Sequence, residues 1–367
     1  MHISELDTPA LIIDLDVFEQ NLRKVQLYAD RHGLRLRPHT KTHKSPEVAR
    51  QQLALGAAGL TVAKVSEAEV LAGALAKTAP FDLLVAFPVI GAQKLERLVR
   101  VARQTPVTVA LDSEAAARPL SDAAHAGGVE IGVLVEIDLG MGRVGVVPGP
   151  EAVNLARLIE ALPGLRFRGI TFYPGQIREP DGEDAPKIPE LGRLLHGLLE
   201  EFARAGLEVS IVSGGSTPTL YHSHLIKGLN EIRPGTYVFN DLNTVLTGAC
   251  TLAECAATVL VTVVSAPRHG HAIVDGGSKT FSSDRPNDGT VSFGRVVESP
   301  ECVFHKMNEE HGFLDTSRAK REFKVGDRLR IIPNHVCVAV NLHEYAYGVR
   351  GETVERNWKV EGRGKLQ

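Results

Sequence analysis

The chain has 367 residues, of which 43% are hydrophobic and 23% charged, and its formal net charge is -3. These values are typical of a globular protein, and a chain this long usually forms more than one domain. The near-neutral charge, without any block of Lys or Arg, argues against nucleic acid as a partner, and no apolar run approaches the roughly 18 residues that a membrane span needs. The first residues contain no apolar signal core, and the four cysteines form no CxxC pair, so we expect a reducing, cytoplasmic setting.

The first 243 residues alternate between β-rich runs and helical patterns. Helices are expected at 66–74, 92–102 and 114–126, and another begins at Ser45-Pro46-Glu47 with a cap residue and a proline. Eight strand–helix units over roughly 210 residues predict a (β/α)8 TIM barrel. A doubly wound sheet is the alternative, but it would usually have fewer strands and a Gly-rich first turn. The apolar runs expected to form strands are 34–38, 59–63, 82–87, 107–112, 131–138, 167–173, 209–213 and 232–240.

The pattern changes after about residue 250, where turns separate short apolar runs and no long helical pattern remains. We therefore predict a barrel at 11–245, followed by an all-β C-terminal domain at 246–367. Residues 1–10 could add to the second domain, and the run at 10–15 could join either. The strands expected in the β domain are 258–264, 272–274, 295–297, 329–332 and 354–360.

A glycine-rich loop, Ser213-Gly214-Gly215-Ser216-Thr217, follows the seventh predicted strand. Glycines let backbone N–H groups approach an anion, and the hydroxyls add donors. By itself the loop could be an ordinary turn. However, barrels often bind a phosphate after strands seven and eight, and Tyr237 lies on the eighth predicted strand. The sequence therefore predicts a phosphate site here.

Lys41 ends the first strand in the segment Pro38-His39-Thr40-Lys41-Thr42-His43-Lys44. A lysine crowded by other basic groups has a lowered pKa and can form a Schiff base. The alternative for such a segment is a solvated basic loop. A Schiff-base lysine together with a phosphate site is what pyridoxal 5'-phosphate (PLP) requires, so we expect this cofactor.

His335 and Cys337 lie two residues apart in the predicted β domain. On a strand both side chains would face the same side, where they could bind one metal ion. A histidine and a thiolate suit zinc, and two protein ligands imply an open, catalytic site. The alternative is a buried cysteine beside a half-exposed histidine.

Together these segments resemble the D-threonine aldolase / D-serine dehydratase family of fold type III PLP enzymes, which are distantly similar to alanine racemase. The matching segments are Asp7–Ala10, Arg37–Lys44, Asp138–Gly145, Ser213–Gly215, Arg233–Tyr237 and Asn334–Leu342, in the family's order. The resemblance covers essentially the whole chain.

The resemblance implies roles for individual residues. Lys41 would be the PLP-linked lysine, and His335 and Cys337 would bind a divalent metal. The remaining cofactor contacts would be His39, Arg143, Tyr173, Ser213, Gly214, Gly215, Ser216, Thr217 and Tyr237. A homodimer is also implied, because in this family the β domain of one subunit closes the barrel of the other.

One departure matters inside the family. The D-threonine aldolases have an aspartate where this chain has Cys337, whereas His-x-Cys is the D-serine dehydratase pattern. A thiolate favours zinc and a carboxylate favours a harder ion such as manganese. We therefore expect dehydration of D-serine or a related D-3-hydroxy amino acid to a 2-oxo acid and ammonia. The alternatives are aldol cleavage to glycine and an aldehyde, an amino-acid racemase, and a non-catalytic PLP-binding protein.

Overall fold

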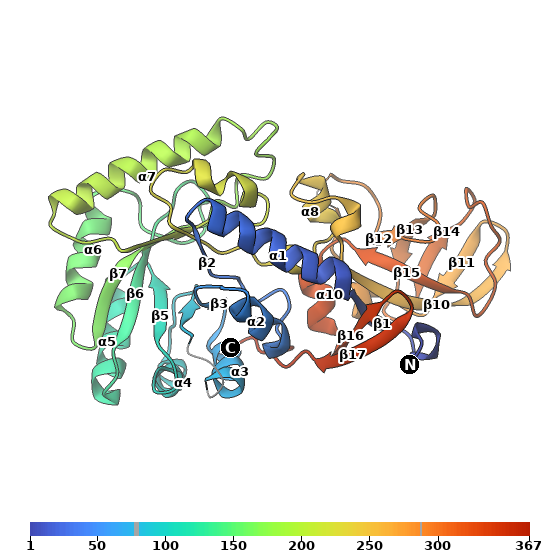
Figure 1. The fold of residues 1–367 in the computed structure, drawn as a ribbon, viewed down its shortest axis with the longest axis horizontal. Coiled ribbons are helices and arrows are strands. Elements are labelled where there is room, and N and C mark those ends of the chain that lie inside the picture. The colour runs from blue at the N-terminus through green and yellow to red at the C-terminus, as the bar shows by residue number, and fades with distance from the viewer. Residues whose placement is uncertain (77–80, 287) are drawn as a thin grey trace. The chain divides into compact units, whose positions relative to one another are not determined.

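A computed structural model of the chain describes residues 1–76, 81–286 and 288–367. Its contacts divide the chain into two compact units (Figure 1). We call the unit formed by 1–24, 42–45 and 236–364 the sheet unit, and the unit formed by 25–41, 46–235 and 365–367 the barrel unit. Within the described ranges, no helix is both long enough and apolar enough to cross a membrane.

The barrel unit contains eight parallel strands in the order β2-β9-β8-β7-β6-β5-β4-β3. The two ends of this order are joined by backbone hydrogen bonds, because the N–H of Thr61 donates to the carbonyl of Pro38 and the N–H of Thr40 donates to that of Thr61, each over 2.8 Å. The predicted barrel is thus confirmed. The strands are β2 (Arg35–Leu36), β3 (Leu60–Val62), β4 (Leu83–Val85), β5 (Val107–Leu111), β6 (Ile131–Glu136), β7 (Leu165–Thr171), β8 (Ile211–Gly214) and β9 (Glu231–Ile232).

Helices cover the outer side of these strands, as Figure 1 shows for α5, α6 and α7 around β5, β6 and β7. In α4 the buried residues Leu95, Leu98 and Val99 recur at helical spacing and form the inward stripe, while the charged residues face water. The helices are α1 (Leu15–Arg31), whose first part belongs to the sheet unit, α2 (Pro46–Ala54), α3 (Val65–Leu75), α4 (Ala92–Ala102), α5 (Glu114–Gly127), α6 (Pro150–Ala161), α7 (Lys187–Arg204) and the 3₁₀ helix η2 (Leu220–Leu225).

The eighth strand is shorter than predicted. The expected run was 232–240, but β9 ends at Ile232, and 236–238 form the 3₁₀ helix η3 (Thr236–Val238). Pro234 follows two residues after β9, and a proline has no N–H with which to continue a strand ladder. The apolar residues after it are buried by helical turns instead of by strand pairing.

The sheet unit is built on strands in the order β13-β14-β11-β10-β1-β16-β17, with β15 pairing with β10 and β12. The run at 10–15 joins this sheet, because β1 pairs with β10 in antiparallel and with β16 in parallel orientation. The strands are β1 (Ala10–Asp14), β10 (Ala257–Arg268), β11 (His271–Val274), β12 (Gly294–Val296), β13 (Val303–Met307), β14 (Gly312–Asp315), β15 (Arg328–Pro333), β16 (Tyr345–Arg350) and β17 (Thr353–Lys359).

The sheet unit also contains elements that the sequence did not predict. Strands β13, β14 and β16 were missed. The polar residues His305 and Lys306 interrupt the apolar pattern of β13, β14 has only four residues, and β16 contains a glycine. The short helices are α8 (Leu242–Leu246), α9 (Ser278–Phe281) and α10 (Val336–Leu342), with 3₁₀ turns η1 (Ile3–Glu5) and η4 (Leu252–Glu254). The two units are defined by the contacts between residues and not by independent folding. The predicted division at 245/246 into separate domains therefore stays a prediction.

Candidate active site

The C-terminal ends of the parallel strands form one rim of the barrel unit, which is where barrel enzymes place their chemistry. Strand β2 leads into His39 and Lys41, and β6 leads into the loop that contains Arg143. Tyr173 follows β7, and the glycine-rich loop follows β8. The fold therefore brings these predicted cofactor residues to the same rim, with Lys41 exposed.

The glycine-rich loop has a geometry that other residues would not easily adopt. Gly215 has a φ of +85°, and a Cβ on Gly214 would lie 2.4 Å from the ring of Phe172. Ser216 is already engaged, because its N–H donates to Oγ1 of Thr219 over 3.1 Å and the two hydroxyl oxygens are 3.0 Å apart. The loop is thus a fixed turn of small residues at the rim, as a phosphate site requires.

Ser213 has a different role from the other loop residues. Its hydroxyl donates to the carboxylate of Glu231 over 2.7 Å and accepts a hydrogen bond of 2.7 Å from Arg233. Both partners are buried inside the barrel unit. This hydroxyl is therefore committed to the interior, which makes Gly214, Gly215 and Thr217 the better candidates for contacting a phosphate.

Arg143 lies over the ring of Tyr173, with its guanidinium carbon 4.6 Å from the ring centroid. The loop that leads to it is fixed by Asp138, whose carboxylate accepts hydrogen bonds from the N–H groups of Gly140, Met141 and Gly142 over 2.9 to 3.0 Å. These bonds, above all that from Gly142, hold the pKa of Asp138 below its ordinary value. Asp138 therefore positions the loop, and Arg143 with Tyr173 offers a cationic and aromatic wall for a cofactor.

Buried charges stabilise the barrel beneath this rim. Arg37 pairs with Glu231 over 3.0 Å and also with Asp82. Burial raises the pKa of Glu136, and the nearby guanidinium groups of Arg233 and Arg143 oppose that rise. Several of these charged side chains pair with each other. Removing one partner would therefore leave an unpaired charge in the interior.

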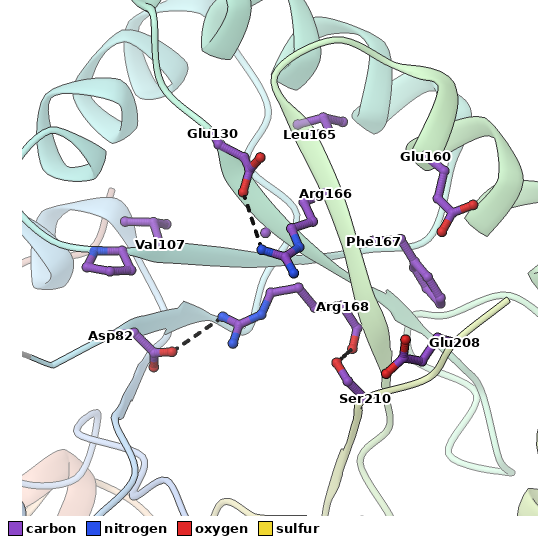
Figure 2. Close-up of a pocket in the computed structure, with 12 residues that line it drawn as sticks. Asp82, Val107, Glu130, Glu160, Leu165, Arg166, Phe167, Arg168, Glu208 and Ser210 are labelled. Carbon is purple, nitrogen blue, oxygen red and sulfur yellow. Dashed lines mark hydrogen bonds and ion pairs between the residues drawn. The ribbon is translucent and has the colours of Figure 1, made fainter.

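A hollow of about 840 Å³ opens at the opposite end of the strands. Figure 2 shows Arg168 paired with Asp82 and Arg166 paired with Glu130 inside it. In barrel enzymes this end contributes to stability and not to catalysis. The hollow is therefore distinct from the candidate active site.

His335 and Cys337 lie at the start of a helix, so the prediction that they alternate on a strand was wrong. Strand β15 ends at Pro333, His335 is the cap residue of α10, and Cys337 lies in its first turn. The change of direction nevertheless brings the two side chains into hydrogen-bonding contact. The start of a helix therefore brings His335 and Cys337 close together, a proximity that was expected from alternation along a strand.

The surroundings of this pair suit a metal ligand set. Nδ1 of His335 is 2.9 Å from the carboxylate of Asp284, which leaves the other ring nitrogen for a ligand or for the cysteine. Sγ of Cys337 is 3.2 Å from Oγ1 of Thr42 and 3.9 Å from that of Thr236. A carboxylate that orients a histidine is the usual outer partner of a metal-binding imidazole.

The charge states of the pair point the same way. The contact with Cys337 raises the pKa of His335 to about 9. Although burial raises the pKa of the Cys337 thiol, the hydrogen bond from His335 brings it below its ordinary value. Such a pair favours a thiolate, and a cation can replace the shared proton. No group of three or more potential metal ligands is found in the described residues.

The predicted site residues are divided between the two units. His39, Lys41, Arg143, Tyr173 and the loop 213–217 belong to the barrel unit, whereas His335 and Cys337 belong to the sheet unit. Tyr237, which is 3% exposed in η3, is also part of the sheet unit.

Sequence reasoning missed Asp284, Asp241 and Thr42 as partners of the histidine–cysteine pair. Asp241 holds the start of α10 by accepting a 2.9 Å hydrogen bond from the N–H of Val336. Asp284 and Asp241 lie far from the pair in sequence, and no spacing rule connects them to it. Thr42 stands next to Lys41 and was inside a segment already singled out.

Comparison with known proteins extends these observations. Residues 13–242 match the family model of the alanine racemase N-terminal domain, and residues 256–349 match that of a serine dehydratase domain. The chain is 32% identical to a D-threonine aldolase of Arthrobacter sp, covering 99% of this chain and 94% of that protein. It is 35% identical to a 3-hydroxy-D-aspartate aldolase of Paracoccus denitrificans (100% and 94% covered) and 34% identical to a D-threo-3-hydroxyaspartate dehydratase of Delftia sp. (90% and 91% covered).

Solved structures agree with these relatives. The crystal structure of D-threonine aldolase from Filomicrobium marinum matches with a TM-score of 0.90 at 34% identity, covering 99% of this chain and 98% of that one. The D-threo-3-hydroxyaspartate dehydratase from Delftia matches with a TM-score of 0.88 at 32% identity, covering 98% of each chain. That dehydratase has also been solved as a histidine-to-alanine mutant and as a cysteine-to-alanine mutant in the metal-free form.

Proposed function

Because this chain belongs to the family of D-threonine aldolases and D-serine dehydratases, we propose that it dehydrates D-serine or a related D-3-hydroxy amino acid to a 2-oxo acid and ammonia. The chain is a PLP-dependent lyase, as its relatives are aldolases and dehydratases that act on D-hydroxy amino acids. The observation that carries the choice of dehydration is the thiol of Cys337 beside His335, at the position where the aldolases have an aspartate.

The spacing between a histidine and a cysteine in one of the relatives supports this choice. The histidine and the cysteine replaced in the two mutants of the Delftia dehydratase are two positions apart, as His335 and Cys337 are. The cysteine mutant of that dehydratase is described as metal-free. We infer that His335 and Cys337 bind a divalent metal here, and that the soft thiolate favours zinc over manganese.

The rim of the barrel unit supports PLP as the cofactor. Lys41 supplies the amine that would hold the cofactor aldehyde, and the loop with Gly214, Gly215 and Thr217 supplies small residues and donors for its phosphate. Arg143, which lies over the ring of Tyr173, would flank the ring of the cofactor. Ser213 and Ser216 would support this pocket, and His39 would orient the lysine, since the N–H of Lys41 lies 3.4 Å from Nδ1 of His39. Tyr237 stays a predicted cofactor contact.

The chain's residues would then divide the reaction between them. Bound PLP serves as an electron sink for the substrate's Cα. Lys41, at the rim of the barrel unit, would accept the Cα proton. His335 and Cys337 would hold a Lewis acid that stabilises the departing hydroxide, and Asp284 would keep the imidazole oriented.

Aldol cleavage is the second candidate, because two of the relatives with 32–35% identity are aldolases. It would need the metal to promote loss of the substrate's hydroxyl proton, after which the Cα–Cβ bond breaks to give glycine and an aldehyde. Cys337 in place of the aldolases' aspartate argues against it. Alanine racemases, matched at 14–15% identity, share the fold alone.

A product assay tests the proposal. The PLP-loaded protein is incubated with D-serine, D-threonine and D-3-hydroxyaspartate, each with and without zinc, and the L-isomers serve as controls. We expect ammonia and 2-oxo acid in equal amounts from at least one D-isomer. Glycine and an aldehyde as the main products would overturn dehydration in favour of aldol cleavage, and interconversion of D- and L-isomers without either product set would indicate a racemase.

We also propose that the active form is a homodimer, with a PLP-binding barrel at 11–245 and a β domain at 246–367 that carries the metal pair. The dimer follows from the resemblance to the family, and the division into domains follows from the change of sequence pattern after about residue 250. Sedimentation analysis across a dilution series tests the dimer, and a monomer with full activity at nanomolar concentration would contradict it.

A further inference from the structure

Two cysteines outside the candidate active site lie next to each other in the sheet unit. Cys250 and Cys255 are both free thiols, and their side chains are within hydrogen-bonding contact. They flank the 3₁₀ turn η4, which is fixed because Glu254 accepts hydrogen bonds from the N–H and hydroxyl of Thr251 over 2.8 and 3.1 Å. A capped 3₁₀ turn therefore lies between the two cysteines.

The two thiols differ in exposure and in acidity. Cys250 is half-buried beside exposed residues, whereas Cys255 is buried. The hydrogen bond with Cys255 lowers the pKa of Cys250, and the same contact raises the pKa of Cys255. A thiolate is the reactive form of cysteine, so the more accessible sulfur is also the better nucleophile.

We propose that Cys250 and Cys255 are a site of reversible disulfide formation, with Cys250 as the attacking thiol and Cys255 as the resolving one. With a peroxide as the oxidant, the sulfur of Cys250 takes one oxygen to become a sulfenic acid while the first water leaves. The thiol of Cys255 then attacks that sulfur, the S–S bond forms and the second water leaves. Two thiols and one hydrogen peroxide thus give one disulfide and two waters, and a dithiol reverses the change.

A chain of hydrogen bonds leads from this pair to the proposed metal ligands. The thiol of Cys250 donates to Oγ1 of Thr244 over 3.5 Å, and the N–H of Thr244 donates to Asp241 over 2.8 Å. Asp241 in turn accepts from the N–H of Val336 over 2.9 Å. Val336 lies between His335 and Cys337, so Asp241 fixes the helix start that positions both.

Oxidation would disturb this series of hydrogen bonds at the bond between Cys250 and Thr244. A disulfide needs an S–S separation of about 2.05 Å, which is shorter than a thiol–thiol hydrogen bond, and it consumes the proton that Cys250 donates to Thr244. We expect the metal affinity of the oxidised protein to fall by about tenfold, the usual scale of losing an outer partner. This second effect rests on the proposed metal pair, whereas the disulfide itself does not.

Mass spectrometry of the zinc- and PLP-loaded protein tests the disulfide. After mild peroxide treatment and alkylation of free thiols, we expect the tryptic peptide that contains both Cys250 and Cys255 to be lighter by two hydrogens and unalkylated. A dithiol should restore two alkylation sites. The proposal is overturned if both cysteines remain alkylatable while other cysteines oxidise, or if reduction does not reverse the change.

Matched variants separate the two effects. Cys250→Ser and Cys255→Ser should abolish the mass change, whereas Cys302→Ser, at a buried thiol elsewhere in the sheet unit, should leave it intact. Zinc affinity is then measured by competition with a chromogenic chelator, and the Cys337 peptide is checked for oxidation. Peroxide should weaken zinc binding in the wild type and leave Cys250→Ser unaffected. A disulfide that forms without changing zinc affinity would overturn the coupling, and wild-type protein without measurable zinc binding before oxidation would refute the metal pair instead.

Discussion

Oγ1 of Thr42 lies 3.2 Å from Sγ of Cys337, within the sheet unit. Thr42 follows Lys41 directly in the chain, so a residue adjacent to the proposed cofactor lysine contacts a proposed metal ligand. A hydroxyl can donate a hydrogen bond to a thiolate and stabilise its charge. Thr42 is therefore expected to tune the sulfur of Cys337.

Replacing Thr42 tests this role. Thr42→Val keeps the shape but removes the hydroxyl, so zinc affinity should fall by about 10- to 100-fold, the range reported for outer partners of metal ligands. Thr42→Ser keeps the donor and should stay near the wild-type affinity. Both are measured by chelator competition, with circular dichroism to confirm folding. Equal zinc affinity in Thr42→Val and the wild type would show that the contact is only packing.

Lys41 is predicted to be the lysine that holds PLP. Lys41→Ala should lose the covalent link and the ammonia-releasing activity, while Lys44→Ala should retain both. Lys44 is a suitable control because it lies in the same segment, with its Nζ 3.3 Å from the carbonyl of Gly362. Borohydride reduction followed by peptide mapping identifies the modified residue. Labelling of a different lysine in the wild type would refute the assignment.

Glu231 should matter for stability because it is fully buried beside Arg37 and Ser213. Glu231→Gln would leave the buried guanidinium of Arg37 with less compensation, and we expect the free energy of unfolding to fall by about 3 kcal/mol. Glu130→Gln is the control, since its side chain is 65% exposed and 3.9 Å from Arg166, where an ion pair contributes little. Urea denaturation measures both. Similar losses in the two variants would contradict the distinction.

His343 should make stability depend on pH. Burial lowers the pKa of His343 to about 4, below its ordinary value of 6.5. Between these values the unfolded chain binds a proton that the folded chain does not, so stability should fall as the pH is lowered from about 6.5 to about 4. His343→Gln should flatten this dependence, while His196→Gln, at a side chain 69% exposed, should not. Urea midpoints across this range give the slopes, and parallel curves for wild type and His343→Gln would argue against the assignment.

The sequence was sufficient for the barrel because each of its strands is a short apolar run bounded by turns. The eighth run was overextended because apolar content alone cannot distinguish a strand from the buried 3₁₀ turn after Pro234. In the sheet unit, β13 carries polar residues at exposed positions and β14 has only four residues, so pairing between strands decides their structure more than local pattern does. Likewise, β1 is placed by partners almost the whole chain away.

The candidate site shows the same limit of local information. Residue type and position were enough to single out Lys41, the loop at 213–217 and the His335–Cys337 pair. The backbone conformation at that pair was not predictable, because β-rich surroundings favoured a strand where the chain forms a helix start. Asp284 and Asp241 reach the pair only through tertiary folding, so no sequence spacing could identify them.

The most direct test of a metal-dependent lyase is ammonia release from D-serine, measured alongside the visible absorbance of bound PLP. The wild-type protein is compared before and after EDTA treatment and after zinc is restored, and Cys337→Ala is compared with it. We predict that EDTA removes most of the ammonia release but leaves the PLP absorbance intact, and that added zinc restores the ammonia release. Cys337→Ala should resemble the chelated enzyme even with zinc present. Turnover of the metal-free protein at the untreated rate, or zinc binding by Cys337→Ala as tight as that of the wild type, would contradict the account.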